Sequence, residues 1–291
     1  AESCSPQLFY RLRRAMLGDA ARQDALDFDA GMKYNPDYNF LLTPFVLYGL
    51  PACYLVAAIS GHFLMRNAAT PSWVKPAMQL YNIAQVVLCT YMAVGMWPAT
   101  FPNFPNVFGI GTEYSAAGEW FILVHFLSKF MDWCDTLWMI LKKKSSVQMS
   151  FLHLYHHATI GVVWGFLLSL GHGNGTAQYG AFINSVTHVI MYTHYFVTGL
   201  GINNPLKNWV TTWQITQFYS CFLHALCVLF FLPSMEVHFP RQLGWLQFCY
   251  HLTMIYLFTF QLRWVPSFLK TGDELAKEAA AAKKKRTAKA H

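Results

Sequence analysis

Three histidines close together in an apolar stretch are the residues of this sequence best suited to chemistry. His153, His156 and His157 lie within the apolar run 149–170. On a helix they stand at i, i+3 and i+4, so their imidazole rings share one face. An imidazole is a competent nucleophile because its neutral nitrogen is available near pH 7. Polar groups inside a membrane need partners, so the cluster predicts a functional site; histidines that only satisfy hydrogen bonds in a packed bundle are the alternative.

Polar residues follow helical stripes in three further apolar stretches. They are Lys129, Asp132 and Thr136 with Asp135 beside them, then Asn184, His188, Met191, Tyr192 and Tyr195, and finally Thr211, Gln214 and Gln217. Because a lone ionised group at that depth is costly, we expect Lys129 to pair with Asp132 or Asp135. A structural ion pair and polar seams between helices are the alternatives. Lipid does not tolerate such stripes, so the economical arrangement turns them inward onto one cavity, with room for an aliphatic chain.

The bulk composition places these stretches in a membrane. Of the 291 residues, 55% are hydrophobic and only 12% are charged, against about 25% in soluble domains. The mean hydropathy is +0.28. The basic residues behind the net charge of +7 flank apolar spans, which argues against nucleic acid as a partner and suits an anionic lipid surface or a negatively charged acyl donor. The seven cysteines show no CxxC spacing, so a metal cluster of the zinc type is not expected.

Apolar spans of about 20 residues, the length of one membrane crossing, predict a single all-α polytopic bundle. The seven spans run over 40–64, 77–97, 118–141, 149–170, 178–199, 210–232 and 243–264. The predicted organisation is a polar N-terminal segment 1–38, a seven-helix transmembrane domain 39–265 and a basic tail 266–291. No internal repeat is visible.

Positive charge alternates between the connections. Lys and Arg stand between the first and second spans, the third and fourth, and the fifth and sixth, and again in the tail, whereas 98–117 and 171–177 have none. Because basic loops stay in the cytosol, we expect a lumenal N-terminus and a cytosolic C-terminus. The sequon that begins at Asn174 falls in a predicted lumenal loop. That loop is so short that we do not expect a glycan there.

Four motifs, in order along the chain, resemble those of the fatty acid elongases, the condensing enzymes of very-long-chain fatty acid synthesis. The matching residues are Lys129–Thr136 for KxxExxDT, His153–His157 for HxxHH, Asn184–Tyr195 for NxxxHxxMYxYY, and Thr211–Gln217 for TxxQxxQ. Asp132 stands where that family has Glu, and His194 stands where Tyr is usual. The resemblance covers residues 129–217, and the first, second and last spans match by hydropathy alone. Residues 148–152, which lead into the histidines, resemble the subgroup that acts on polyunsaturated acyl chains.

The resemblance implies a seven-helix, multi-pass enzyme of the endoplasmic reticulum membrane, a very-long-chain 3-oxoacyl-CoA synthase. Such an acyltransferase joins a long-chain acyl-CoA, in this case a polyunsaturated one, to malonyl-CoA. It gives CO2, CoA and a 3-oxoacyl-CoA two carbons longer. It uses no metal and no cofactor beyond these substrates. Its implied partners in lipid biosynthesis are the 3-oxoacyl-CoA reductase, the dehydratase and the enoyl reductase of the elongation cycle.

The same resemblance suggests a role for each site residue. His156 is expected to take the acyl group as an acyl-imidazole and to free CoA, since a dry cavity protects such an intermediate from hydrolysis. The expected donors to the enolate oxygen of malonyl-CoA are His153, His157, His188 and Asn184. The expected substrate-binding residues are Lys129, Asp132, Asp135, Asn184, Tyr192, Gln214 and Gln217. The Lys142–Lys144 run either meets CoA phosphates or is the usual positive flank of a span.

Two other classes of protein fit part of the pattern. Membrane di-iron desaturases and hydroxylases also carry HxxHH motifs, but they need several histidine clusters, and the 12 histidines of this chain form only one. A non-enzymatic seven-helix transporter explains the apolar spans and the buried ion pair. It does not explain three histidines on one face, and it is expected to show internal pseudo-symmetry.

Overall fold

The computed structural model describes residues 35–100, 107–109, 114–231, 239–261, 267–277 and 280. Throughout this part of the chain the regular secondary structure is helical, and it contains no strand. The all-α prediction is confirmed for these residues. Most of the predicted polar segment 1–38 and much of the basic tail 266–291 lie outside them.

Helical segments fill all seven predicted spans in the described part of the chain. In chain order the elements are η1 (Pro36–Leu41), η2 (Phe45–Gly49), α3 (Leu50–Met65), α4 (Val74–Thr100), α5 (Ala116–Met131), α6 (Trp133–Leu141), α7 (Ser145–Gln148), α8 (Phe151–Ser169), α9 (Thr176–Gly199), α10 (Lys207–Leu226), η3 (Cys227–Phe231), α11 (Arg241–Gln261) and η4 (Ser267–Leu269). Residues 272–277 form a further short helix. The third predicted span is divided, because Asp132 separates α5 from α6.

Four of the described helices are long and apolar enough to cross a membrane. They are Phe45–Met65, Val74–Pro98, Phe151–Ser169 and Lys207–Phe231. Large apolar side chains such as Val56, Leu64 and Val87 point outward from the first two of them, as lipid contact requires. The chain is therefore a multi-pass membrane protein. The α5–α6 pair is broken at Asp132, so neither of its helices is long enough to cross alone. α9 and α11 are long enough but carry amides and histidines.

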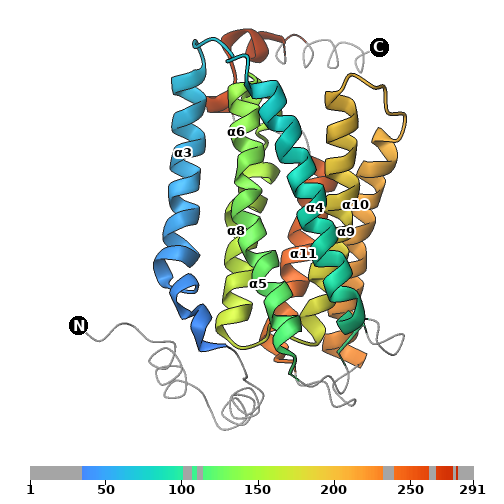
Figure 1. Ribbon diagram of the computed structural model, residues 1–291. Helices are drawn as coiled ribbons and strands as arrows, with labels where there is room; N and C mark the ends of the chain where they lie inside the picture. The colour runs from blue at the N-terminus through green and yellow to red at the C-terminus, as the bar shows by residue number, and fades with distance from the viewer. Residues whose placement is uncertain are drawn as a thin grey trace, which may run out of the picture.

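The helices run side by side as one bundle (Figure 1). α4 packs along α9, α10 along α11 and α5 along α8, while α3 lies against α6 and α8. An apolar core that includes Met92, Ile122, Phe126, Leu168 and Ala181 fills the end of the bundle where α8 ends and α9 begins. The opposite half holds the start of α8 and the later turns of α9, which carry the polar stripes.

Two glycines allow the close helix contacts that fix α5 between its neighbours. A Cβ atom at Gly165 of α8 would lie only 2.7 Å from a ring atom of Phe126 in α5. A Cβ atom at Gly95 of α4 would collide with the ring of Phe121, also in α5. A larger side chain at either position would push packed helices apart. The glycines thus hold α5, which carries Lys129, against α4 and α8.

The connection between α8 and α9 keeps its sequon inside the fold. The hydroxyl of Thr176 donates to the carbonyl oxygen of Phe108 at 2.7 Å, and Oδ1 of Asn174 accepts from the backbone nitrogen of Ser115 at 3.1 Å. The amide nitrogen of Asn174, the atom that would carry a glycan, is buried. These contacts support the expectation that this asparagine carries no glycan.

Candidate active site

The histidine motif lies in the first two turns of α8. Ser150 caps this helix: its backbone is extended, and its Oγ accepts a hydrogen bond from the backbone nitrogen of His153, 3.2 Å away, as N-cap serines do. The ring centroids of His153 and His157 are 4.1 Å apart, and those of His156 and His157 are 5.5 Å apart. The three imidazoles lie together, as their spacing predicts. No group of three or more His, Cys, Asp or Glu side chains that could hold a metal ion occurs in the described part of the chain.

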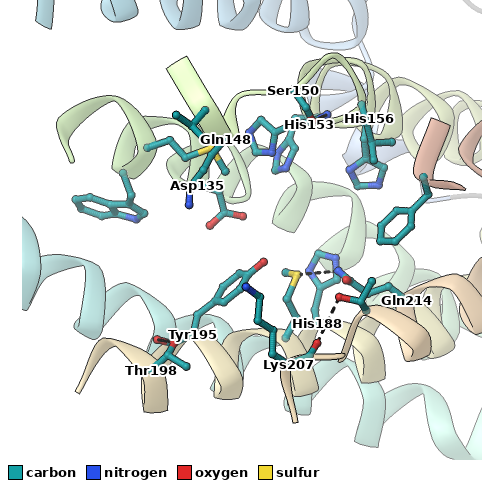
Figure 2. A pocket seen from close by; sticks show the side chains of 18 of the residues that line it. Asp135, Gln148, Ser150, His153, His156, His188, Tyr195, Thr198, Lys207 and Gln214 are labelled. Carbon is teal, nitrogen blue, oxygen red and sulfur yellow. Dashed lines mark hydrogen bonds between the residues drawn. The ribbon is translucent and has the colours of Figure 1, made fainter. Parts of the chain in front are cut away.

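A cavity of about 1090 Å³ adjoins these histidines. The predicted residues that line it are Asp135 of α6, His153, His156 and His157 of α8, Asn184 and His188 of α9, and Gln214 and Gln217 of α10. Figure 2 shows His153 and His156 on one side of this cavity and His188 and Gln214 on the other. The polar stripes of α8, α9 and α10 thus face one internal space, as the cost of exposing them to lipid predicts. The third predicted span contributes only Asp135, because its own stripe of Lys129, Asp132 and Thr136 lies outside the lining.

Lys129 and Asp132 lie behind the cavity wall and are not among its lining residues. Lys129 is 1% exposed and Asp132 is 2% exposed. The lysine Nζ donates to Oδ2 of Asp132 at 3.3 Å and to Oδ1 of Asn184 at 2.9 Å. Nδ1 of His188 lies 3.8 Å from Oδ2 of Asp132. The predicted ion pair therefore forms with Asp132, and both members hold residues that do line the cavity.

A second layer of hydrogen bonds fixes the two aspartates. The hydroxyl of Tyr192, a further predicted site residue behind the wall, donates to Oδ2 of Asp135 at 2.7 Å. The amide of Gln85 in α4 donates to Oδ1 of Asp132 at 2.9 Å and to the hydroxyl of Tyr81 at 2.8 Å. Sequence reasoning did not single out Gln85 or Tyr81. An amide deep in the apolar second span was the available signal, since buried polar groups need partners.

His156 differs from the other two histidines in its surroundings. Nε2 of His153 lies 2.7 Å from Oγ1 of Thr136, whereas no hydrogen bond to the ring of His156 or of His157 is formed by a described residue, and Nδ1 of His157 is buried. His156 also lines a second, narrower cavity of about 70 Å³, and His153 and His157 are not among the lining residues of that cavity. Its ring therefore stands uncommitted where the two cavities meet.

The narrow cavity is largely apolar and follows α8 away from the histidines. Ile160, Val163, Trp164 and Leu167 line it from one face of that helix, at the i, i+3, i+4 and i+7 positions of a single stripe. Phe218 lines both cavities, together with Asn184 and Gln217. The two spaces are therefore neighbours that share a polar boundary, and the narrow one extends into the apolar half of the bundle.

Lysines line the wide cavity at the end of the bundle where α8 and α10 begin. They are Lys142, Lys207, Lys270 and Lys277. Of the predicted Lys142–Lys144 run, only Lys142 lines the cavity. Lys270 and Lys277 come from the chain after α11, and no local pattern in the sequence indicates that this segment returns to the site.

Two contacts hold the returning segment in place. Leu269 is fully buried in a cluster with Tyr54 and Met149. The hydroxyl of Ser146 donates to Oε1 of Glu274 at 2.8 Å. The segment that follows the last long helix therefore forms part of the rim of the wide cavity.

Comparison with known proteins agrees with this arrangement. Residues 39–270 match the family model described as ELO, the GNS1/SUR4 family. The chain is 42% identical to "Fatty acid elongase 5" of Leishmania major over 227 residues, which is 77% of this chain and 87% of that protein. It is 40% identical to "Fatty acid elongase 5" of Trypanosoma cruzi over 225 residues, 77% of this chain and 85% of that protein. It is 31% identical to mouse "Very long chain fatty acid elongase 5" over 71% of this chain and 69% of that protein. The chain belongs to the ELO (GNS1/SUR4) family.

Proposed function

We propose that this protein joins a long-chain acyl-CoA to malonyl-CoA and releases CO2, CoA and a 3-oxoacyl-CoA two carbons longer. Family membership makes the chain a condensing enzyme of fatty acid elongation. The identity of the thioester substrates, the order of the steps and the roles of the residues are the proposal. The reaction needs no cofactor beyond the two thioesters.

One observation carries the proposal: His156 lies where the wide cavity meets the narrow one. An acyl-CoA has a large anionic head, a long apolar tail and a thioester between them. The wide cavity has lysines on its lining, and the narrow cavity has mostly aliphatic and aromatic side chains. A molecule with its head in the wide cavity and the first carbons of its tail in the narrow one presents its thioester carbon near His156. At about 70 Å³ the narrow cavity must widen to admit a longer tail.

In the first step, the unprotonated ring nitrogen of His156 attacks the thioester carbonyl carbon. A C–N bond forms, the C–S bond breaks, and CoA leaves as its thiol after it takes the ring proton. The resulting acyl-imidazole keeps its capacity for acyl transfer, and the surrounding bundle restricts the access of water that would hydrolyse it.

In the second step, malonyl-CoA enters the wide cavity and loses CO2, which leaves an enolate. The enolate carbon attacks the acyl carbonyl carbon, and the C–N bond to His156 breaks as the leaving ring nitrogen takes a proton from water. The 3-oxoacyl-CoA and neutral His156 are the products. Charge develops on the enolate and carbonyl oxygens, so donors fixed in the cavity wall lower the barrier. We assign this role to His153, His157, His188 and Asn184, all of which line the wide cavity. Gln214 and Gln217, on another helix, are assigned to the thioester and the pantetheine arm.

The head of each CoA substrate is assigned to the lysine-lined end of the wide cavity. Lys142, Lys207, Lys270 and Lys277 supply cationic donors that suit phosphate oxygens. Lys129 and Asp132 take no direct part, because neither lines the cavity. Their contacts to Asn184 and His188 support a role in holding these two residues in position.

The placement in the cell is part of the proposal. All seven helical segments cross the membrane of the endoplasmic reticulum, with the N-terminus lumenal and the C-terminus cytosolic. The lysine-lined end then opens to the cytosol, in keeping with basic loops on that side. A 3-oxoacyl-CoA must be reduced, dehydrated and reduced again before the next cycle, so a 3-oxoacyl-CoA reductase, a dehydratase and an enoyl reductase are the expected partners. Polyunsaturated C18 chains are the proposed substrates.

The test uses microsomes or purified protein and a radiolabelled C18 polyunsaturated acyl-CoA, with and without malonyl-CoA. We expect free CoA and a protein-bound acyl group without malonyl-CoA, and a 3-oxo C20 thioester once it is added. Release of CoA only when malonyl-CoA is present would contradict the covalent step. Oxidised chains of unchanged length, with iron in the protein, would favour a desaturase or hydroxylase instead.

A further inference from the structure

A chain of hydroxyl groups leads from α3 to the histidine motif. The hydroxyl of Tyr54 lies 2.9 Å from Oγ1 of Thr136, and Oγ1 of Thr136 lies 2.7 Å from Nε2 of His153. Tyr54 is 6% exposed and Thr136 is 2% exposed, so solvent does not compete for these bonds. His153 lines the wide cavity, and the other two residues lie behind it.

A second contact ties Tyr54 to the same motif through a different residue. The rings of Tyr54 and Trp133 are stacked, with centroids 4.9 Å apart and planes at 17°. Nε1 of Trp133 donates to the backbone oxygen of His157 at 2.8 Å. Tyr54 therefore supports the residues on both sides of His156 in the motif, although its own helix carries none of the four sequence motifs.

The chemistry of the three groups favours one order of donors in this chain, and that order sets the state of His153. A phenol is a stronger acid and a weaker acceptor than an aliphatic hydroxyl, so Tyr54 is the preferred donor to Thr136. Thr136 has one proton and then gives it to Nε2 of His153. With Nε2 accepting, a neutral His153 carries its proton on Nδ1. Nδ1 is then a donor on a ring that lines the cavity.

We propose that Tyr54 is a positioning residue for carbon–carbon bond formation. Through Thr136 it holds His153 in the tautomer that offers the Nδ1 proton to the oxygen where charge develops. The inference rests on the proposed function in one respect, the role of His153 as a donor. Tyr54 has no part in the first step, which depends on the uncommitted nitrogen of His156.

The decisive variant is Tyr54→Phe, which keeps the ring stacked on Trp133 and removes only the hydroxyl. We expect kcat for condensation to fall about tenfold, less than the loss of a donor itself would cause. We expect the KM for malonyl-CoA to stay at its wild-type value. The amount of CoA that is released from acyl-CoA in the absence of malonyl-CoA should also be unchanged. Tyr91→Phe is the matched control, because that hydroxyl only accepts a bond from Trp120 at 3.1 Å on an exposed surface.

Substitutions of Thr136 test the same chain independently and cover the case in which Tyr54→Phe folds poorly. Thr136→Ser retains the hydroxyl and should retain activity, whereas Thr136→Val has the same shape without it and should lose condensation. The double variant Tyr54→Phe, Thr136→Val should be no worse than Thr136→Val alone, because both changes break one chain. In ¹⁵N-histidine NMR spectra, the Nδ1-protonated signal of His153 should diminish in Tyr54→Phe.

Three results would overturn the inference: wild-type condensation in Tyr54→Phe and Thr136→Val, an equal loss of both steps in either variant, or an unchanged tautomer. An equal loss of both steps would mark a purely structural role. Failure of the proposed function looks different, since wild-type protein itself would then release no CoA from acyl-CoA alone. The inference about Tyr54 and the covalent mechanism can therefore fail separately.

Discussion

Lys129 of α5 donates a hydrogen bond to Asn184 of α9, with 2.9 Å between Nζ and Oδ1. The same ammonium pairs with Asp132. One buried charge therefore connects the end of α5 to α9, the helix whose Asn184 and His188 line the cavity. A lysine that the sequence motif marks as a substrate ligand is thus a link between helices.

Replacing Lys129 by Met should destabilise the protein before it affects chemistry. The change leaves Asp132 buried without its cation, which costs about 3–5 kcal/mol. We expect a lower midpoint of thermal unfolding in detergent and a low yield of folded protein. The double variant Lys129→Met, Asp132→Asn should recover part of that loss, because no charge is then left unpaired. A well-folded but inactive Lys129→Met would instead indicate direct contact with substrate.

The two steps of the proposed reaction should respond differently to two histidine substitutions. His156→Ala should abolish both CoA release and the protein-bound acyl group, because it removes the nucleophile. His153→Ala should keep both and lower condensation by about 10²–10³-fold, the usual effect of losing one oxyanion donor. Quantification of CoA and of labelled protein, with and without malonyl-CoA, separates them. Normal turnover by folded His156→Ala would remove that residue from the role of nucleophile.

The depth of the narrow cavity should set the longest acyl chain that is accepted. Gly180 lines it, and a Cβ atom there would only touch Trp164 at 3.6 Å. Gly180→Ala should therefore be tolerated, whereas Gly180→Leu should fill the space. Each methylene that is kept out forfeits about 0.8 kcal/mol, or about fourfold in kcat/KM.

Phe239 lies toward the other end of the same cavity, where its ring is 5.9 Å from that of His172. Phe239→Ala should extend the accepted length. The measurement is the chain-length profile of products from a mixture of acyl-CoAs. An unchanged profile in both Gly180→Leu and Phe239→Ala would show that the acyl chain lies elsewhere.

The contact between Ser146 and Glu274 should depend on pH in a defined direction. Burial alone would raise the pKa of Glu274, but hydrogen bonds from Thr271 and Ser146 outweigh it and hold the pKa below the ordinary value of 4.5. A carboxylate with a lowered pKa stabilises the folded arrangement above the unfolded value, and that contribution is lost as pH falls through the lowered one. The contact should therefore persist at pH 5 and fail only at a pH below the ordinary glutamate value of 4.5.

The measurement is the distance between spin labels at positions 147 and 277, which lie close in sequence to Ser146 and Glu274. The distance distribution should be narrow at pH 7 and pH 5 and broad in more acidic samples. Glu274→Gln, which does not titrate, is the control and should show no such change. Broadening already between pH 7 and pH 5 would contradict the lowered pKa.

Features that repeat within one helix were predictable, and features assembled between helices were not. The spacing of His153, His156 and His157 predicts their shared face, because it depends on helical geometry alone. The sequence also predicts that Lys129 pairs with Asp132 or Asp135, and the structure shows the pair with Asp132. Gln85 shares a helix face with Asn82 and Gln79, three and six residues earlier, and Tyr54 lies in an apolar helix. Their importance comes from Asp132 and from partners on α6 and α9. The spacing within one helix does not name a partner on another.

The same limit applies to the rim of the wide cavity. Lys142 follows a span and was a visible candidate, but Lys270 and Lys277 reach the site because the chain turns back after α11. Leu269 directs this return by burying its side chain, and a single leucine in a mixed segment gives no such indication in the sequence. Hydropathy likewise predicted the positions of the helices but not the break at Asp132.

The position of His156 between two unlike cavities has a kinetic consequence. Only the wide cavity is lined by lysines suited to a CoA head in the described part of the protein, so in the proposed reaction acyl-CoA and malonyl-CoA would occupy it in turn while His156 holds the acyl group. Such a ping-pong enzyme is inhibited by an excess of its own second substrate, because malonyl-CoA that enters first excludes the acyl donor. The ratio of the two CoA esters in the cell, and not the amount of either alone, would then set the rate of chain growth.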